Sequence, residues 1–157
     1  MTCKNTKTAS AYYETKIGRI KIVYTDCSVC GISLSDETGE SVPSPLSDLA
    51  FRQISEYLDG KRKSFDLPIS FSCTPFSERV FRALSSVPYG SVITYKSLAA
   101  SCGSPNACRA VGNALHNNPV FIVIPCHRVV SSDGKRGGFA YGASLKKFLL
   151  DLERASF

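Results

Sequence analysis

Residues 94–116 are TYKSLAASCGSPNACRAVGNALH, which is two helical patterns separated by a short turn. The first pattern covers 94–101 and places Leu98 and Ala99 on its inner side. Cys102-Gly103 predicts a tight turn, and Ser104-Pro105 predicts the start of a second helix that ends at His116. A helix, a short glycine-containing turn and a helix indicate a helix-turn-helix, whose second helix enters a groove of DNA.

The second helix of this pair has two different faces. The pattern predicts an inner face of Cys108, Val111 and Leu115 and an outer, polar face of Arg109, Gly112, Asn113 and His116. A glycine inside a helix costs about 1 kcal/mol relative to alanine, so Gly112 suggests that a ligand such as DNA approaches the backbone closely. A surface helix with a tolerated glycine is the alternative.

The chain that follows carries the most reactive side chain. Asn118-Pro119 precedes the apolar run Val120–Ile124, which predicts a buried strand. The run leads into Pro125-Cys126-His127-Arg128, where the neighbouring cations are expected to lower the pKa of the Cys126 thiol. Cys126 is therefore the candidate nucleophile.

A last helix supplies a candidate partner for His127. The stripe of Leu145, Phe148, Leu149 and Leu152 predicts its buried face, and Glu153 falls at the edge of that face. A carboxylate at such a place needs a partner. A relay of Cys126, His127 and Glu153 would join a nucleophile, a base and a group that orients the base. The alternative is a surface carboxylate with no partner.

The first half of the chain has a different pattern. Strands are expected at 11–14, 19–24, 29–34 and 68–71, with a turn at Ile17-Gly18 and a helix from Leu46 to Leu58 that Gly60 ends. Thr74-Pro75 then begins a helix as N-cap and first helical residue. The sequence predicts an α/β (α+β) protein: an N-terminal sheet-plus-helix domain, 1–73, and a mainly helical C-terminal domain with the helix-turn-helix, 74–157.

Charge and composition restrict the partners. The net charge is +6: residues 1–74 hold nine basic and nine acidic side chains, whereas 75–157 hold ten basic and four acidic ones. This excess indicates nucleic acid as the partner of the second half, with a merely well-solvated surface as the alternative. The start lacks a secretory pattern and no apolar run reaches membrane-spanning length, so we expect an intracellular, cytoplasmic protein with no membrane association.

The cysteines do not form a complete metal-binding pattern. Seven cysteines are an odd number, and the chain has only two histidines. Zinc held by Cys3, Cys27 and Cys30 is therefore not expected, and a disulfide is the better expectation for the C-x2-C pair if the source organism is a thermophile. We expect no metal in this protein.

The sequence resembles a known family around the candidate nucleophile. Ile124-Pro125-Cys126-His127-Arg128-Val129-Val130 is similar to the signature of the O6-alkylguanine-DNA alkyltransferases (methylated-DNA–protein-cysteine methyltransferases). The similarity runs from Phe76 to Glu153 and includes Val92-Ile93-Thr94-Tyr95, Leu98-Ala99, Arg109-Ala110-Val111-Gly112, Asn118-Pro119, Gly134, Gly142, Lys146 and Leu149-Leu150. Residues before this region resemble the family's N-terminal, RNase H-like domain only in their order of strands and helix.

The resemblance implies direct-reversal DNA repair in a single turnover. An alkyl group moves irreversibly from O6-alkylguanine, and also from O4-alkylthymine, in double-stranded DNA to Cys126, with no cofactor and with a monomeric protein bound in the minor groove. The implied catalytic residues are Cys126, His127, Glu153, Tyr95 and Asn118. The implied DNA-binding residues are Arg109, Tyr95, Lys96, Ser104, Gly112, Asn113 and Ser132.

The resemblance also implies a pocket for the flipped base. Its residues are Tyr95, Val129, Phe139, Ala140 and Tyr141, of which Phe139 and Tyr141 depart from the residues common in relatives and imply a bulkier lid. A lesion-binding protein of the same family without transfer activity is the alternative, and Cys126 argues against it. A sequence-specific transcription factor would not need Pro125-Cys126-His127-Arg128, and a Cys-His hydrolase would not need Arg109 and Tyr95.

Overall fold

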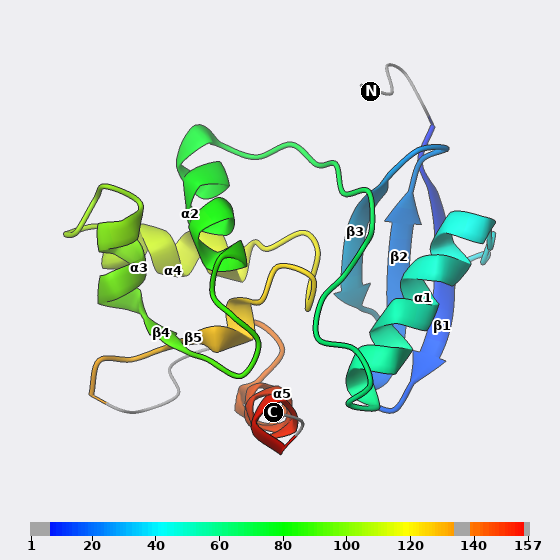
Figure 1. The fold of residues 1–157 in the computed structure, drawn as a ribbon. Helices are drawn as coiled ribbons and strands as arrows, with labels where there is room; N and C mark the ends of the chain where they lie inside the picture. The colour runs from blue at the N-terminus through cyan, green and yellow to red at the C-terminus, as the bar shows by residue number, and fades with distance from the viewer. Residues whose placement is uncertain (1–6, 134–138, 156–157) are drawn as a thin grey trace. The chain divides into compact units, whose positions relative to one another are not determined.

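The computed structural model describes residues 7–133 and 139–155, so Cys3 and Gly134 lie outside the described residues. The chain divides into two compact units (Figure 1). One contains the chain up to Ser72 together with Pro119–Phe121, and the other contains Cys73–Asn118 and the chain from Ile122 onward. The order of elements confirms the expected α/β class: a sheet and a helix come first, and helices dominate the rest.

The first unit is built on a three-stranded antiparallel sheet in the order β1-β2-β3. Its strands are β1 (Ala9–Thr15), β2 (Gly18–Tyr24) and β3 (Val29–Leu34). Alternate residues of β2 point into the core, where Ile20 and Ile22 are fully buried, as the period of a half-buried strand requires. The expected strands and turn are confirmed, with slightly longer β1 and β2.

Helix α1 (Pro45–Leu58) packs across one face of this sheet (Figure 1). Ser44 and Ser47 form a capping box at its start, and Gly60, with φ of 75°, follows its C-cap. Ile54 and Tyr57 are fully buried in the shared core. The predicted helix is therefore confirmed.

Two predicted strands are wrong. Ile69 forms a single parallel bridge to Val29, so 68–71 is not a strand. Val120 bridges Ile32, but the chain then turns at Ile122, whose φ of 73° is rare for a β-branched residue. Val120 and Phe121 are still fully buried. The apolar run therefore predicted burial correctly, but the β-strand that it also predicted is wrong.

The second unit begins with three helices. They are α2 (Pro75–Ser85), α3 (Tyr95–Ser101) and α4 (Cys108–His116). Thr74 and Thr94 cap α2 and α3 by accepting hydrogen bonds from backbone N–H groups, so the first two predicted starts are confirmed. α3 and α4 form the helix-turn-helix.

Helix α4 starts four residues later than the sequence predicted. Ser104 and Ala107 close a turn through a backbone hydrogen bond of 2.9 Å, which places Pro105 within a turn instead of a helix. Val111, Ala114 and Leu115 form the buried face. Cys108, predicted on the inner face, is exposed: its spacing places it on the side of Leu115, but it is the first residue of the helix.

A short parallel pair of strands brings distant parts of the second unit together. β4 (Ile93–Thr94) lies beside β5 (Val129–Val130), with Ile93 opposite Val129. α3 follows β4 directly, and the 3-10 helix η1 (Cys126–Arg128) directly precedes β5. The first residue of α3, Tyr95, is thereby placed close to the turn that carries Cys126.

Helix α5 (Ala143–Ala155) packs against η1. Its buried residues are Lys146, Leu149, Leu150 and Glu153. The predicted stripe is wrong in part, because Phe148 is 39% exposed while Lys146 is fully buried. The buried face is therefore rotated and contains two ionisable side chains.

No helix in the described part of the chain is both long enough and apolar enough to cross a membrane. Within residues 7–133 and 139–155, no group of three or more His, Cys, Asp or Glu side chains could hold a metal ion. Cys27 is disulfide-bonded and Cys30 is a free thiol. The two residues of the C-x2-C pair are therefore not bonded to each other.

Candidate active site

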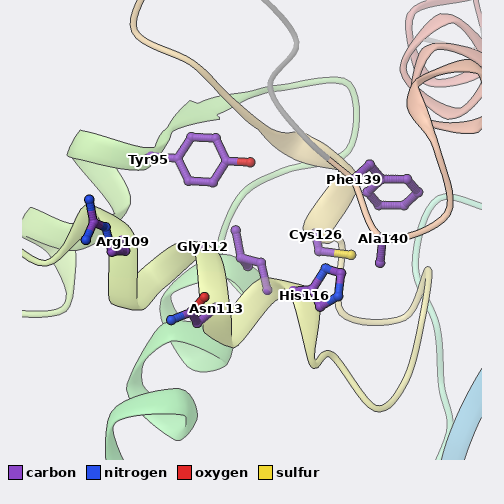
Figure 2. A pocket seen from close by; sticks show the side chains of 9 residues that line it. Tyr95, Arg109, Gly112, Asn113, His116, Cys126, Phe139 and Ala140 are labelled. Carbon is purple, nitrogen blue, oxygen red and sulfur yellow. The ribbon is translucent and has the colours of Figure 1, made fainter.

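Cys126 lies at the base of a cavity of about 380 Å³ in the second unit. The side chain is 7% exposed, so the thiol is reached through this cavity. Figure 2 shows it among side chains from α3, α4 and the segment that precedes α5. The lining residues are Tyr95, Arg109, Gly112, Asn113, Leu115, His116, Cys126, Phe139 and Ala140. The cavity holds the candidate nucleophile and residues of the helix-turn-helix together.

Burial, more than charge, controls the Cys126 thiol. Burial raises its pKa, while a hydrogen bond from Asn118 and the positive charge of Lys146 act in the opposite direction. The prediction that neighbouring cations give a lowered pKa is therefore wrong in sign, because desolvation outweighs them. The resting group is a thiol, and a base must remove its proton.

Asn118 connects the end of α4 to the turn that carries the nucleophile. Its Nδ2 donates a 2.8 Å hydrogen bond to the carbonyl of Ile124 and lies 3.3 Å from the Cys126 sulfur. The same amide therefore fixes the backbone before Cys126 and offers an N–H to the sulfur. This donor stabilises a thiolate more than a thiol.

His127, the residue after Cys126, forms a buried pair with Glu153. His127 Nε2 lies 2.6 Å from Glu153 Oε2, and their side chains are 0% and 1% exposed. Burial lowers the pKa of His127, and the adjacent Glu153 opposes this effect. The imidazole is consequently a neutral base at physiological pH. The alternative of a surface carboxylate at Glu153 is wrong.

Arg128 completes this buried cluster. Its Nε and Nη2 donate to Glu153 Oε1 and Oε2 at 2.9 Å and 3.1 Å, and its Nη1 donates to the carbonyl of Val87 at 2.8 Å. Such a bidentate pair compensates a buried carboxylate with matched N–H donors. The sequence suggested Arg128 as a cation beside Cys126 and as part of the signature motif, and it did not predict the pairing with Glu153.

Tyr95 and Lys146 are two further groups close enough to Cys126 for their charges to interact with it. Burial, followed by the Cys126 charge, raises the pKa of the Tyr95 phenol, so it remains an O–H donor. Lys146 Nζ donates to the carbonyl of Val129 and lies 5.9 Å from the centre of the Tyr95 ring. Burial lowers the pKa of Lys146 to about 8.

Only some of the predicted DNA-binding residues line the cavity. Arg109, Gly112 and Asn113 do, and Figure 2 shows the Arg109 side chain at the end away from Cys126. A Cβ on Gly112 would meet no atom within 4 Å, so no contact within the protein requires glycine there. Lys96, Ser104 and Ser132 lie on the same unit outside the lining.

The predicted base pocket is also brought together in part. Phe139 and Ala140 line the cavity. Tyr141 is not among the lining residues, because its ring packs edge-on against Phe139 with centroids 5.9 Å apart. Val129 is buried outside the lining, and its carbonyl accepts the Lys146 hydrogen bond.

The structure also brings Lys146, Arg128 and His116 to the site, in roles that the sequence did not predict. Lys146 had a detectable signal, since it lies seven residues before Glu153 and so on the same face of α5. Figure 2 shows the His116 imidazole pointing into the cavity, on the side of α4 that helical periodicity predicted. The pairing of Arg128 with Glu153 and the Val87 carbonyl had no local signal, because these partners are distant in sequence.

Two family models match the chain and together cover most of it. Residues 75–155 match the model described as 6-O-methylguanine DNA methyltransferase, DNA binding domain. Residues 9–71 match the model described as 6-O-methylguanine DNA methyltransferase, ribonuclease-like domain. These matches agree with the predicted family and with the RNase H-like character expected of the first half.

Individual relatives carry consistent names. The methylated-DNA–protein-cysteine methyltransferase of Methanosarcina barkeri is 51% identical over 104 residues, covering 66% of this chain and 66% of the relative. The constitutive enzyme of that name from Bacillus subtilis is 37% identical over 155 residues, covering 92% and 94%. A structure of Mycobacterium tuberculosis OGT in complex with DNA matches with a TM-score of 0.86 and 31% identity, covering 94% of this chain and 93% of that chain.

Proposed function

Because this chain belongs to the 6-O-methylguanine DNA methyltransferase family, we propose that it repairs DNA by moving an alkyl group from O6-alkylguanine to Cys126. DNA is its partner, and the reaction is a direct reversal of damage. The observation that carries the assignment of Cys126 is a buried thiol that lines a cavity and is followed in the chain by His127, which is paired with Glu153. O4-alkylthymine is proposed as a second substrate.

Binding places the lesion at the cavity. Helix α4 presents Arg109, Gly112 and Asn113 at the cavity, so we assign them to the minor groove of the duplex. A stacked base cannot reach a thiol that is 7% exposed, and the damaged nucleotide must therefore be flipped out. Arg109 fills the gap left in the stack. Lys96, Ser104 and Ser132 contact backbone phosphates and position the protein without reading the sequence.

Proton transfer prepares the nucleophile. The Cys126 thiol gives its proton, through one water molecule, to the neutral imidazole of His127, and Glu153 stabilises the resulting charge. Asn118 and Lys146 stabilise the thiolate that remains. The base is needed because burial disfavours the thiolate at the start of the reaction.

Displacement then transfers the alkyl group. The thiolate attacks the alkyl carbon, a C–S bond forms, and the bond between that carbon and guanine O6 breaks. The electron pair moves into the purine ring, and Tyr95 donates a proton or hydrogen bond to N3 of the leaving guanine. The thioether is not a leaving group, so each protein molecule reacts once. No cofactor takes part.

Mass spectrometry after incubation with an O6-methylguanine duplex tests this assignment. We expect the mass of one methylene to be added to the peptide that contains Cys126, at no more than one equivalent per protein molecule. Cys126→Ala should accept no methyl group and still bind the duplex, because phosphate contacts dominate affinity. Methyl on another residue, or transfer by the Cys126→Ala protein, would contradict the assignment.

The same experiment separates the alternative function. A lesion-binding protein without transfer activity would bind the modified duplex and gain no mass. Substituting an O4-methylthymine duplex tests the second substrate in the same way. Size-exclusion chromatography of the protein with and without duplex tests the proposed monomer.

A further inference from the structure

Arg128 is a buried cation that the proposed reaction steps do not use. It is 8% exposed, and all three of its side-chain nitrogens donate hydrogen bonds. Two of these bonds reach the two oxygens of Glu153, which is 1% exposed and hydrogen-bonded to His127. The guanidinium and the imidazole therefore share one carboxylate.

The loop Val87–Gly90 holds both members of this ion pair. The Val87 carbonyl accepts from Arg128 at 2.8 Å, and the Tyr89 ring lies 5.7 Å from the guanidinium carbon. The N–H of Gly90, whose φ is 81°, donates to Glu153 Oε1 at 3.0 Å. Each carboxylate oxygen thus has at least two partners, which hold the carboxylate in its orientation toward His127.

We propose that Arg128, held by the Val87–Gly90 loop, is a positioning residue for alkyl transfer that keeps Glu153 a carboxylate directed at His127 Nε2. With Nε2 engaged in this way, Nδ1 is the imidazole nitrogen that receives the proton of the Cys126 thiol. This proposal rests on the proposed function. It assigns to Arg128 a role that acts through Glu153 and not through contact with the DNA.

The physical reason is the cost of a buried charge. Without a cation beside it, a carboxylate in a dry site takes up a proton. Among the described residues, the charged groups that act on His127 include Glu153 and Lys146 from α5 and Arg128 from η1, and the Cys126 thiol is next to it in the chain. Arg128 is the one among them that binds both oxygens of Glu153.

Loss of the Arg128 charge changes the proton affinity of the Glu153–His127 pair in a predictable direction. Glu153 and His127 titrate as a coupled pair. Removing a neighbouring positive charge makes this pair bind an added proton more tightly, whether the proton is on the imidazole or on the carboxylate. A pair that already carries this proton cannot accept another from the thiol. The acid limb of the pH–rate profile must therefore move to higher pH.

The test compares Arg128→Met, which removes the charge, with Arg128→Lys, which keeps the charge but loses the planar fork. The single-turnover rate of methyl transfer from an O6-methylguanine duplex is measured against pH, together with duplex affinity and melting temperature. The chain has two histidines, so His127 is also followed by NMR, with the exposed His116 as internal reference.

For Arg128→Met we expect a fall in rate of about tenfold or more and an upward shift of about one pH unit in the acid limb and in the His127 titration. Duplex affinity should not change. For Arg128→Lys we expect a slower rate with a midpoint close to that of the wild type. If Arg128→Met does not fold, Arg128→Lys decides: a lower rate at unchanged affinity and melting temperature supports the proposal.

Two results would overturn it. One is a folded variant with the wild-type rate and the wild-type His127 midpoint. The other is a fall in rate that is fully explained by a loss of folded protein, while the His127 midpoint of Arg128→Met stays at the wild-type value. A purely structural arginine would give this second result. Failure of the wild-type protein to take up methyl would instead refute the proposed function, and the NMR titration would still report on Arg128.

Discussion

Asn118 illustrates how one amide serves both backbone and chemistry. Its Nδ2 binds the Ile124 carbonyl and lies 3.3 Å from the Cys126 sulfur. Hydrogen bonds to charged groups contribute about 1.5–3 kcal/mol, so Asn118→Ala should slow methyl transfer by about 10- to 100-fold. The rate of Cys126 alkylation by a small alkyl halide, measured against pH, should show a raised thiol pKa.

Asn118→Asp is the matched control for that prediction. It keeps the shape of the side chain, removes the N–H donor and adds a negative charge beside the sulfur, so it should react more slowly than Asn118→Ala. An unchanged thiol titration in both variants would show that Asn118 acts only on the backbone.

Lys146 is the subject of a second prediction about a single residue, which concerns the stability of the protein. Burial holds its pKa at about 8 in the folded protein, against an ordinary 10.5. Between these values the unfolded chain binds the proton and the folded one does not, so stability due to Lys146 increases as pH rises through this window. The unfolding free energy of wild type relative to Lys146→Met should therefore rise by about 1–3 kcal/mol across it.

Chemical denaturation of both proteins at pH values below 8 and near 10.5 measures this difference. Because the Lys146 charge also acts on the Cys126 thiol, both proteins are compared in a Cys126→Ala background, which removes the titration of that thiol. A difference that does not vary with pH would mean that the Lys146 ammonium is hydrated in the folded protein.

At the scale of elements, helix α4 combines a weak helix former with a binding surface. Gly112 lies inside a nine-residue helix, and a Cβ there would contact nothing in the protein. Gly112→Ala should therefore stabilise the protein by up to about 1 kcal/mol. The same methyl group would project into the cavity, where DNA must approach, and duplex affinity should fall.

Thermal melting of the Gly112→Ala protein measures the expected gain in stability, and titration with duplex measures the expected loss of affinity. Ala110→Gly, at an exposed position of the same helix outside the cavity, should lower stability and leave duplex affinity unchanged. If Gly112→Ala binds duplex as well as the wild type does, the backbone of α4 is not approached closely.

At the scale of the whole molecule, the two units are not two consecutive segments of the chain. Pro119–Phe121 belongs to the first unit although it lies between parts of the second. Its Phe121 N–H donates to the Ile32 carbonyl at 3.0 Å, and Val120 and Phe121 are fully buried. A fragment of residues 74–157 would expose both side chains to water.

We therefore expect the 74–157 fragment to melt at a lower temperature than the full chain, or not to fold, even though it contains every predicted site residue. Burial of two such side chains contributes about 3–6 kcal/mol, which is a large part of the stability of a small domain. Circular dichroism melting of both proteins measures the effect. Equal melting temperatures would show that the boundary at residue 74 separates independent domains.

Local sequence patterns were sufficient to predict those elements that depend on interactions between residues close together in the chain. Thr74 and Thr94 cap their helices through N–H groups three residues away, and β2 buries alternate side chains, so these elements followed from spacing alone. Cys126 and His127 are adjacent in the chain, so their motif by itself indicated the chemistry and the family.

Only the tertiary structure determined the features that depend on distant contacts. Arg128 meets Glu153 across 25 residues and the Val87 carbonyl across 41, and no local pattern encodes either contact. Burial likewise reversed the expected shift in the pKa of Cys126, because desolvation depends on everything packed around the thiol. The sequence by itself determined which reactive groups are present, and the folded environment determined their protonation, because solvent exclusion is a property of the assembled core.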